Sequence, residues 1–472
     1  MSYIHPAMSI LSDDQKALLY EKALWILKNV GVKIECPEVF GLFAKKIGIK
    51  CEGEVVKIPG ELVKTCLDQV ARNVDIYNRR GEKAFSLGPD TNDETRFSIG
   101  SPQLNYQDPL TREIEQWERR HTGLIAGLAN TLDTFDAIAT PGTIHDYGPK
   151  EADYYSTLEM LANTEKPILI LVSNDSEFPG ILKFINALFP QLTEKPFVVP
   201  YLNIITPLVL NKGTTDKMRK AFEYGLPVIF NNYIMAGATA PVLPAGYMAL
   251  ILAELLSGIV CSQLIKEGSG IICGSLPTAF NMSSMTAAYS SVSTLISHSV
   301  AEMMAYFGVP HSGTSGNSIG WEGDLLQAGI IWINNLGSLM GKVGLCPFSG
   351  PVFQATTLSP TAILLADEII CEARKYARGV KLEDDFLLDE IKEVGPGGSY
   401  FGTRTTFERF KEFQPDSKIW PDMTLAKWQE YGMPTANQIL REKTNQMLGQ
   451  LAKPFDCKKI LEKGESYIKS FG

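Results

Sequence analysis

The chain has 472 residues, of which 45% are hydrophobic and 21% charged, and its formal net charge is −9. This composition is that of an ordinary soluble globular protein, and the length allows one large domain with extensions or two to three smaller domains. The acidic balance argues against a nucleic-acid or anionic-membrane partner, because both require a basic surface.

Residues 1–92 are predicted to form an α+β cap. The stretch SDDQKALLYEKALWILKNVG opens on Ser12, a favourable N-cap residue, and closes on Gly31, which predicts a helix. A short strand and a second helix follow in GEVVKIPGELVKTCLDQV, and VDIYNRRGEKAFSLG predicts a hairpin. The N-terminus has no basic region followed by an apolar core, so we expect no signal peptide.

Residues 93–380 repeat one pattern eight times. Short apolar runs alternate with helical stretches near residues 118–133, 150–163, 176–189, 214–224, 243–266, 284–307, 323–341 and 360–378. The apolar runs are Thr95–Leu104, Asp136–Thr140, Pro167–Ser173, Phe197–Ile205, Pro227–Ile234, Gly270–Gly274, Val309–Gly313 and Gly344–Ser349. This alternation indicates parallel strands buried on both faces. Eight such units without a dinucleotide-type break favour an α/β fold of the (β/α)8 TIM-barrel type over a doubly wound sheet.

One helical stretch, Gly246–Ile265, is apolar enough to suggest a membrane span. It contains Glu254 and Gln263, so a buried core helix is the better interpretation. Residues 381–472 are more charged and are predicted to form a helical extension that packs on the barrel, with a dimerisation arm as the open alternative.

The eight cysteines are scattered, without a C-x-x-C pair and without histidines at ligand spacing. This pattern is typical of reduced thiols in a cytoplasmic protein, and it predicts neither a disulfide framework nor a zinc site.

The chemistry of a barrel lies at the carboxyl ends of its strands and in the loops that follow. Here those loops read SPQLNYQD, NIITP, NNYIMAGATAP, VPHSGTSGNSIGWEGD and CPFSGPVFQATT, with amides, hydroxyls, glycines and aromatic rings predominating. They contain no H-x-H pair, no lysine at a strand end and no cluster of carboxylates. A metal-dependent hydrolase or a Schiff-base lyase would need those groups, so we predict neither.

Six aromatic residues fall at or just beyond strand ends. Aromatic faces attract a quaternary ammonium ion, which cannot donate hydrogen bonds, although the same rings could simply pack the top of the barrel. Acidic residues near strand ends leave another alternative open, a barrel lyase or hydrolase that uses Asp108, Asp175 or Glu322 as its base. We expect these acids to cap helices or face solvent. The aromatic residues are Tyr106, Tyr201, Tyr233, Trp321, Phe348 and Phe353.

The segment IMAGATAPVLPAGYMALILAELLSGIVCSQLIKEGSGIICG (Ile234–Gly274) carries a family resemblance. It resembles the trimethylamine methyltransferase superfamily. The resemblance extends along nearly the whole chain, through the stretches NYQDPLTREIEQWERRHTGLIAGLANTLDTFDAI, SPTAILLADEII and VGPGGSYFGTRTTFERFKEFQP. The resemblance implies a (β/α)8 barrel that moves a methyl group from a methylamine to the cobalt of a separate corrinoid protein. The archaeal trimethylamine enzymes carry pyrrolysine. This sequence has only standard residues, so it is similar to the branch that demethylates quaternary amines such as glycine betaine, proline betaine or carnitine.

When Co(I) attacks a methyl carbon of a quaternary amine, the remaining tertiary amine leaves as a neutral molecule, so no general acid is required. A tertiary amine would need a proton first, and no evident group supplies one. We therefore assign no catalytic residue and predict catalysis by positioning. In this hypothesis Tyr106, Tyr201, Tyr233, Trp321, Phe348 and Phe353 bind the cation, and Asn231, His311, Gln354 and Arg404 bind the carboxylate or hydroxyl end.

Three glycines, Gly313, Gly316 and Gly350, are predicted to keep the barrel mouth open for the corrinoid, which the partner protein carries. No resident cofactor or metal is expected. A homo-oligomer is expected from base rates alone. A non-catalytic betaine-binding protein is the remaining alternative.

Overall fold

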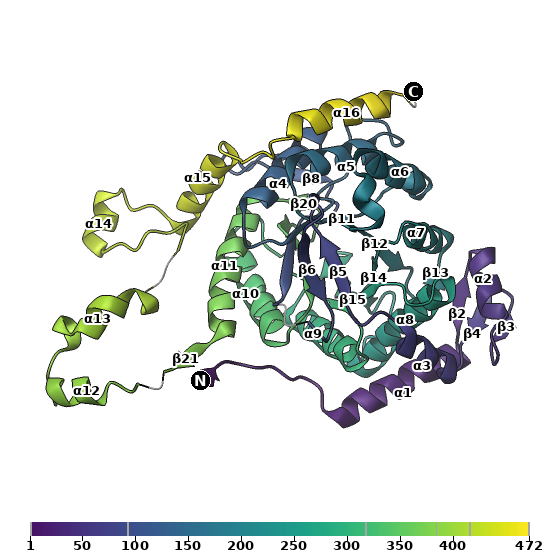
Figure 1. Ribbon diagram of the computed structural model, residues 1–472, viewed down its shortest axis with the longest axis horizontal. Coiled ribbons are helices and arrows are strands. Elements are labelled where there is room, and N and C mark those ends of the chain that lie inside the picture. The colour runs from purple at the N-terminus through teal and green to yellow at the C-terminus, as the bar shows by residue number, and fades with distance from the viewer. Residues whose placement is uncertain (1, 92–93, 317–318, 384, 415–416, 471–472) are drawn as a thin grey trace.

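A closed barrel of eight parallel strands forms the centre of the computed structural model, which describes residues 2–91, 94–316, 319–383, 385–414 and 417–470 (Figure 1). The strands pair in the order β7-β10-β11-β12-β14-β15-β17-β18, and β18 pairs with β7 to close the ring. The predicted (β/α)8 fold is confirmed. The strands are β7 (Arg96–Ile99), β10 (Ala137–Ala139), β11 (Ile168–Ile170), β12 (Val198–Ile204), β14 (Val228–Ala236), β15 (Ile271–Asn281), β17 (His311–Ser312) and β18 (Leu345–Ser349).

Helices surround the barrel, one after each strand, as the alternating pattern predicts. Buried side chains on both faces of the strands explain why the strand sequences are continuous apolar runs. The helices are α4 (Arg119–Thr131), α5 (Ala152–Asn163), α6 (Phe178–Leu188), α7 (Lys212–Glu223), α8 (Pro244–Ile265), α9 (Ser291–Tyr306), α10 (Leu325–Met340) and α11 (Pro360–Arg378). Short 3-10 turns lie at Asp175–Glu177 and Pro190–Thr193.

The sixth barrel strand differs from its prediction. β15 continues to Asn281 instead of ending at Gly274, and it forms an antiparallel hairpin with β16 (Thr286–Ala288). The side chain of Asn281 accepts hydrogen bonds from the backbone of Ser283 and Ser284, which makes the turn. The helix expected from residue 284 therefore begins only at Ser291.

The amino-terminal end of the barrel is closed by the predicted hairpin, β5 (Val74–Tyr77) and β6 (Lys83–Leu87). The backbone of Tyr77 bonds that of Pro196 at 2.9 Å, just before β12 begins. Apolar side chains from the hairpin pack with the inward-facing residues of the barrel strands. The interior is thus filled from below, and only the carboxyl ends of the strands are left for a cavity. The hairpin side chains are Val74, Ile76, Phe85 and Leu87.

The remaining cap begins with α1 (Asp13–Asn29), whose first turn has the capping box predicted by Ser12. Its small sheet joins the barrel, because β2 pairs with β13, a short strand in the loop after β12. The other elements are α2 (Pro37–Ala44), α3 (Gly60–Gln69), β2 (Val32–Ile34), β3 (Lys50–Glu52), β4 (Val55–Lys57) and β13 (Val209–Leu210).

Helix α8 is the apolar stretch that suggested a membrane span. It is long and apolar enough by composition, but 89% of its most apolar window is buried inside the protein. The interpretation as a core helix is confirmed.

Beyond the barrel the chain divides into two parts (Figure 1). Helices α15 (Ala436–Leu448) and α16 (Cys457–Lys469) return to the barrel and pack against its helices. Helices α12 (Leu388–Val394), α13 (Arg404–Arg409) and α14 (Leu425–Glu430), with 3-10 turns at Tyr400–Gly402 and Phe410–Phe413, project away from it. We call α12–α14 the arm. At its base, β21 (Val380–Leu382) pairs with β1 (Ser2–Ile4).

A second small sheet lies in the loops after β7 and β18. Its strands are β8 (Asn105–Gln107), β9 (Ile114–Gln116), β19 (Pro351–Val352) and β20 (Thr357–Leu358), in the order β19-β20-β8-β9.

Candidate functional site

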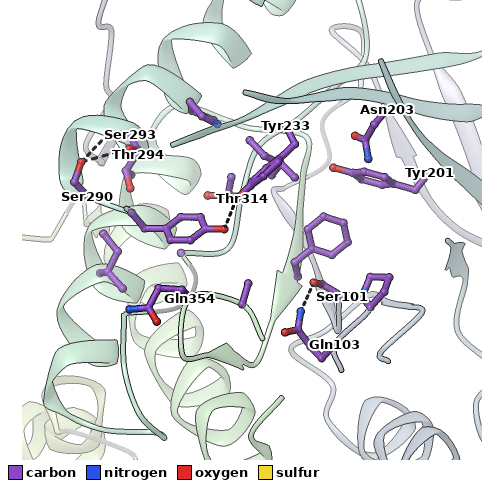
Figure 2. Close-up of a pocket in the computed structure, with 18 of the residues that line it drawn as sticks. Ser101, Gln103, Tyr201, Asn203, Tyr233, Ser290, Ser293, Thr294, Thr314 and Gln354 are labelled. Carbon is purple, nitrogen blue, oxygen red and sulfur yellow. Dashed lines mark hydrogen bonds between the residues drawn. The ribbon is translucent and has the colours of Figure 1, made fainter. Parts of the chain in front are cut away.

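A cavity of about 340 Å³ lies at the carboxyl end of the barrel, within the size range of small-molecule sites. Residues from the ends of the barrel strands, from the loops that follow them and from helices α9 and α10 form its walls (Figure 2). They are Ser101, Pro102, Gln103, Leu171, Tyr201, Asn203, Tyr233, Leu276, Pro277, Tyr289, Ser290, Ser293, Thr294, Thr314, Gly316, Ile330, Phe348, Gln354 and Ala355.

Two aromatic rings form part of the inner wall. Tyr201 on β12 and Phe348 on β18 are buried, with ring centroids 4.9 Å apart and planes at 56°. Both belong to the cluster of inward-facing side chains that fills the barrel. Alternate residues of a strand face the same side. The side chains of β12 and β18 that face the barrel interior therefore include the two rings, which lie at the cavity end of that interior.

A short chain of hydrogen bonds holds Tyr201. The side-chain amide of Asn231 donates to its hydroxyl at 2.6 Å, and Ser312 in turn donates to the Asn231 carbonyl oxygen at 3.2 Å. All three residues are buried. Burial raises the pKa of the Tyr201 phenol, because a phenolate would lose its hydration there. Tyr201 is therefore neutral throughout the physiological pH range.

The described part of the cavity wall carries partial charges but no ionised group. Among its described lining residues there is no Asp, Glu, Lys, Arg or His. Two amide oxygens at the wall, Gln103 Oε1 and Asn203 Oδ1, are buried and have no hydrogen-bond partner in the described structure. An unpaired buried carbonyl oxygen is costly, and it is stabilised by a positively charged ligand.

The backbone around the mouth is strained. Phe348 has φ 78°, and three consecutive residues, Phe353, Gln354 and Ala355, have φ between 51° and 62°. Non-glycine residues in this region cost about 1–2 kcal/mol each, and such strain is typical of functional sites. The loop after β18 thereby brings Gln354 and Ala355 to the cavity wall.

Five of the residues proposed from the sequence come together at this cavity: Tyr201, Tyr233, Phe348, Gln354 and Gly316. The hydroxyl of Tyr233 lies 3.4 Å from that of Tyr289, a wall residue that the sequence did not suggest. Asn231 does not line the cavity but holds Tyr201, which does.

Three of the predicted aromatic residues lie elsewhere. Tyr106 on β8 is buried and stacks on His121, with ring centroids 4.3 Å apart. Trp321 is exposed, and its carbonyl accepts a hydrogen bond from Gln107. Phe353 does not line the cavity, and its backbone N–H donates to the carbonyl of Gly320.

The remaining predicted residues are also away from the wall. His311 precedes the inward-facing Ser312, so it faces outward, and its ring nitrogen contacts the carbonyl of Val309. Arg404 lies on the arm with its side chain 88% exposed and pairs with Glu408. Gly313 and Gly350 pack closely instead, since a Cβ there would approach Val343 at 3.0 Å and Ile363 at 2.6 Å.

None of the three acids considered as a base lines the cavity. Asp108 accepts hydrogen bonds from the backbone of the turn that follows it. Asp175 pairs with Lys217 at 2.6 Å. Glu322 is buried and forms two hydrogen bonds with Arg441. Each acid has a structural role, so the lyase or hydrolase alternative has no base at this site. Nowhere in the described ranges do three or more His, Cys, Asp or Glu side chains form a group that could hold a metal ion.

Sequence reasoning missed two parts of the wall. Gln103 and Asn203 lie in the loop stretches noted above, but amides are common in loops and nothing in one sequence marks these two. Tyr289, Ser290, Ser293 and Thr294 fall in a stretch expected to be helical throughout. The signal that could have separated them is Ser290, a favourable N-cap residue followed by an apolar helical pattern.

The fold and the cavity define a TIM-barrel protein with a ligand site at the carboxyl ends of its strands. The chain matches the model of the trimethylamine methyltransferase (MTTB) family over residues 2–470, and it belongs to that family. It is therefore a methyltransferase by kind.

Curated relatives agree with this assignment. A trimethylamine methyltransferase MttB of Desulfitobacterium hafniense is 24% identical over 88% of this chain and 84% of its own. A glycine betaine methyltransferase of Desulfitobacterium hafniense is 25% identical over 87% of this chain and 86% of its own. Among solved structures, the monomethylamine methyltransferase MtmB of Methanosarcina barkeri has the same fold, with a TM-score of 0.51 at 10% identity over 96% of this chain and 91% of that one.

Proposed function

We propose that this protein transfers a methyl group from a small quaternary ammonium compound of the betaine type to Co(I) of a corrinoid carried by a partner protein. The observation that carries the proposal is the cavity wall, which is aromatic and polar but has no ionised side chain among its described residues.

A cation is the ligand that this wall favours. The ring faces of Tyr201 and Phe348 carry negative electrostatic potential, and the unpaired oxygens of Gln103 and Asn203 add two carbonyl dipoles. The methyl hydrogens of a quaternary ammonium carry part of its positive charge, so they can contact both kinds of group without a conventional donor. A relative named glycine betaine methyltransferase supports the betaine class.

The proposed reaction is an in-line displacement at one methyl carbon. The electron pair of Co(I) forms the new cobalt–carbon bond, and the carbon–nitrogen bond breaks with its electron pair remaining on nitrogen. The leaving tertiary amine is neutral, so no proton is needed. The protein has to hold the cation and aim one methyl group outward, which is catalysis by positioning.

The acceptor would have to reach the mouth from outside, because a cavity of about 340 Å³ is too small for a protein-bound macrocycle and the substrate together. Exposed apolar residues on the loops that follow the strand ends, and at the first residue of α10, form what we call the mouth rim. An apolar patch beside a site is typical of a protein-binding surface, and here we propose the corrinoid protein as its partner. The mouth rim comprises Val242, Leu243, Met282, Met285, Trp321 and Leu325.

We further propose that the arm packs against a second copy of the chain. Leu388, Phe401 and Phe407 are 69%, 94% and 80% exposed, and the arm projects from the barrel (Figure 1). Apolar surface of this kind favours association, because burying it removes it from water.

We also propose the reducing cytoplasm as the compartment of this protein. All eight of its cysteines are free, which supports that proposal.

The test is a direct assay of the transfer. The purified protein is mixed with free cob(I)alamin and, in turn, glycine betaine, carnitine, choline and trimethylamine, and the spectrum of methylcobalamin is followed. We expect methylcobalamin with at least one quaternary compound and none above background with trimethylamine. Rapid turnover of trimethylamine, or no methylcobalamin with any of the quaternary compounds, would overturn the proposal.

A further inference from the structure

The cavity has two chemically different walls (Figure 2). One side carries Tyr201, Asn203 and Gln103, which present ring faces and carbonyl oxygens. The other side carries Ser290, Ser293 and Thr294 from the start of α9, all of which bear hydroxyl groups. Figure 2 shows the two groups facing each other across the cavity.

The hydroxyl wall is also the N-terminus of a helix of 16 residues. Backbone N–H groups in the first turn of a helix have no intrahelical partner, and the helix dipole adds partial positive charge there. Ser290 caps the backbone of Ser293, and the first turn contains no acidic residue. The positive end of α9 is therefore not neutralised by its own sequence.

Thr294 gives a second, independent indication that this wall binds a group of the ligand. Thr294 is only 7% exposed and lines the cavity, and its side-chain hydroxyl makes no hydrogen bond to any described residue. A threonine in a helix usually bonds the carbonyl four residues earlier, as Thr157, Thr215 and Thr444 do in this protein. A hydroxyl that lines the cavity without a protein partner is free to donate a hydrogen bond to an acceptor on a bound ligand.

We infer that the start of α9, with the Thr294 hydroxyl, binds the carboxylate of a zwitterionic substrate whose quaternary ammonium lies against Tyr201 and Phe348. This inference rests on the proposed function and extends it, because it selects zwitterions over simple quaternary cations. A simple cation would leave the hydroxyl wall unused and would be repelled by the helix terminus. The cavity holds each end of a betaine against the wall of opposite sign.

Two probe compounds with the same ammonium group distinguish the contributions of the two walls to binding. Glycine betaine ends in a carboxylate, and ethyltrimethylammonium ends in a methyl group. We expect the wild-type protein to bind glycine betaine at least about tenfold more tightly in calorimetric titration. Thr294→Val removes the hydroxyl at nearly constant side-chain volume. We expect this variant to bind glycine betaine about 10- to 100-fold more weakly, as for the loss of other hydrogen bonds to charged groups. Binding of ethyltrimethylammonium should change less than twofold.

A charge variant tests the helix terminus without removing any group from the wall. Val292 is exposed in the first turn of α9, where an aspartate favours the helix. The Val292→Asp variant should therefore fold. We expect it to bind glycine betaine more weakly and ethyltrimethylammonium more tightly than the wild type. Thr294→Ser should keep glycine betaine binding within about threefold, because the hydroxyl remains. Thr444→Val is the matched control, since it removes a buried helical hydroxyl far along the chain, on α15.

The outcomes distinguish the inference from the proposed function. If Thr294→Val and Val292→Asp change both probes alike, or change neither, the carboxylate site is wrong even when methyl transfer proceeds. If the wild-type protein binds neither probe and transfers a methyl group to cob(I)alamin from none of glycine betaine, carnitine and choline, the proposed function itself is wrong. Opposite responses of the two probes to Val292→Asp would support the inference directly.

Discussion

The amide of Asn231 donates a 2.6 Å hydrogen bond to the hydroxyl of Tyr201, so the hydroxyl oxygen is already occupied inside the barrel. Asn231 is itself held by Ser312 on β17. The ring of Tyr201 is therefore fixed by contacts from two other strands, while its face remains available to the cavity. Tyr201 serves the site through its ring, and its hydroxyl serves to hold that ring in place.

Tyr201→Leu and Tyr201→Phe should separate these two contributions. The leucine variant loses the ring face, and a cation–π contact is worth about 0.5–2 kcal/mol, so we expect the Kd for glycine betaine to rise about 2- to 30-fold. The phenylalanine variant keeps the ring, so its Kd should stay within about threefold of the wild type. Calorimetric titration measures both. Equal losses in the two variants would show that the hydroxyl and not the ring binds the ligand.

Ligand affinity should be independent of pH between 6 and 9. Burial raises the pKa of Tyr201 above its ordinary value, so this phenol stays neutral over that range. No carboxylate among the described lining residues can be protonated as the pH falls, and none can add attraction as it rises. Titrations with ethyltrimethylammonium at several pH values measure this. A tenfold loss of affinity for each pH unit lowered would reveal an ionised carboxylate at the site.

Charges placed on the mouth rim should impair transfer to the partner protein but not to free cobalamin. Met282 and Leu325 are 77% and 87% exposed, so Met282→Asp and Leu325→Asp should fold normally. We expect the double variant to lose about tenfold or more in rate with the corrinoid protein, as for a charge placed in an apolar interface. With free cob(I)alamin its rate should match the wild type. Ile47→Asp is the control, because Ile47 is 97% exposed on the N-terminal cap.

Charges on the arm should reduce self-association. We expect Phe401→Asp combined with Phe407→Asp to shift the molecular mass in light scattering from a multiple of 52.0 kDa to the single chain. Ile47→Asp should leave the mass of the assembly unchanged. A wild-type protein that is a single chain at high micromolar concentration would contradict the role proposed for the arm.

An ion pair between the buried Arg79 and the partly buried Asp456 joins the C-terminal helices to the hairpin that closes the barrel. Both terminal nitrogens of Arg79 bond the Asp456 carboxylate, at 2.7 and 2.8 Å, and the Arg79 side chain is only 2% exposed. Asp456→Asn should lower the free energy of unfolding by about 1–3 kcal/mol, because a buried guanidinium loses its charged partner. Urea unfolding measures the change, and the exposed Asp422→Asn is the control.

The same pair makes a prediction about pH. The hydrogen bonds from Arg79 lower the pKa of Asp456. A carboxyl group with a lowered pKa stabilises the folded state above its unfolded pKa of about 3.9, and that contribution is lost as the pH falls through the folded value. The difference between wild type and Asp456→Asn should therefore be constant from pH 6 to 8 and shrink below about pH 4. A difference that grew on acidification would contradict the assignment.

The sequence by itself determined the fold. Eight short apolar runs separated by helices allow few arrangements, because parallel strands must be buried on both faces and connected by crossovers. The sequence also indicated that the strand ends carry no lysine, no H-x-H pair and no cluster of carboxylates, since such residues are visible wherever they occur. Tyr201, Tyr233 and Phe348 were proposed from their places at strand ends, and the structure brings them to one cavity.

Only the tertiary structure decided which of the candidates meet. Tyr106 and His311 also lie near strand ends, but the second small sheet and the strand alternation direct them elsewhere. Gln103 and Asn203 were not singled out, because an amide oxygen becomes informative only when the surrounding fold buries it without a partner. The facing walls of the cavity come from segments nearly 200 residues apart, Gln103 and Thr294. Their opposition depends on barrel closure, a long-range geometry that local sequence patterns do not encode.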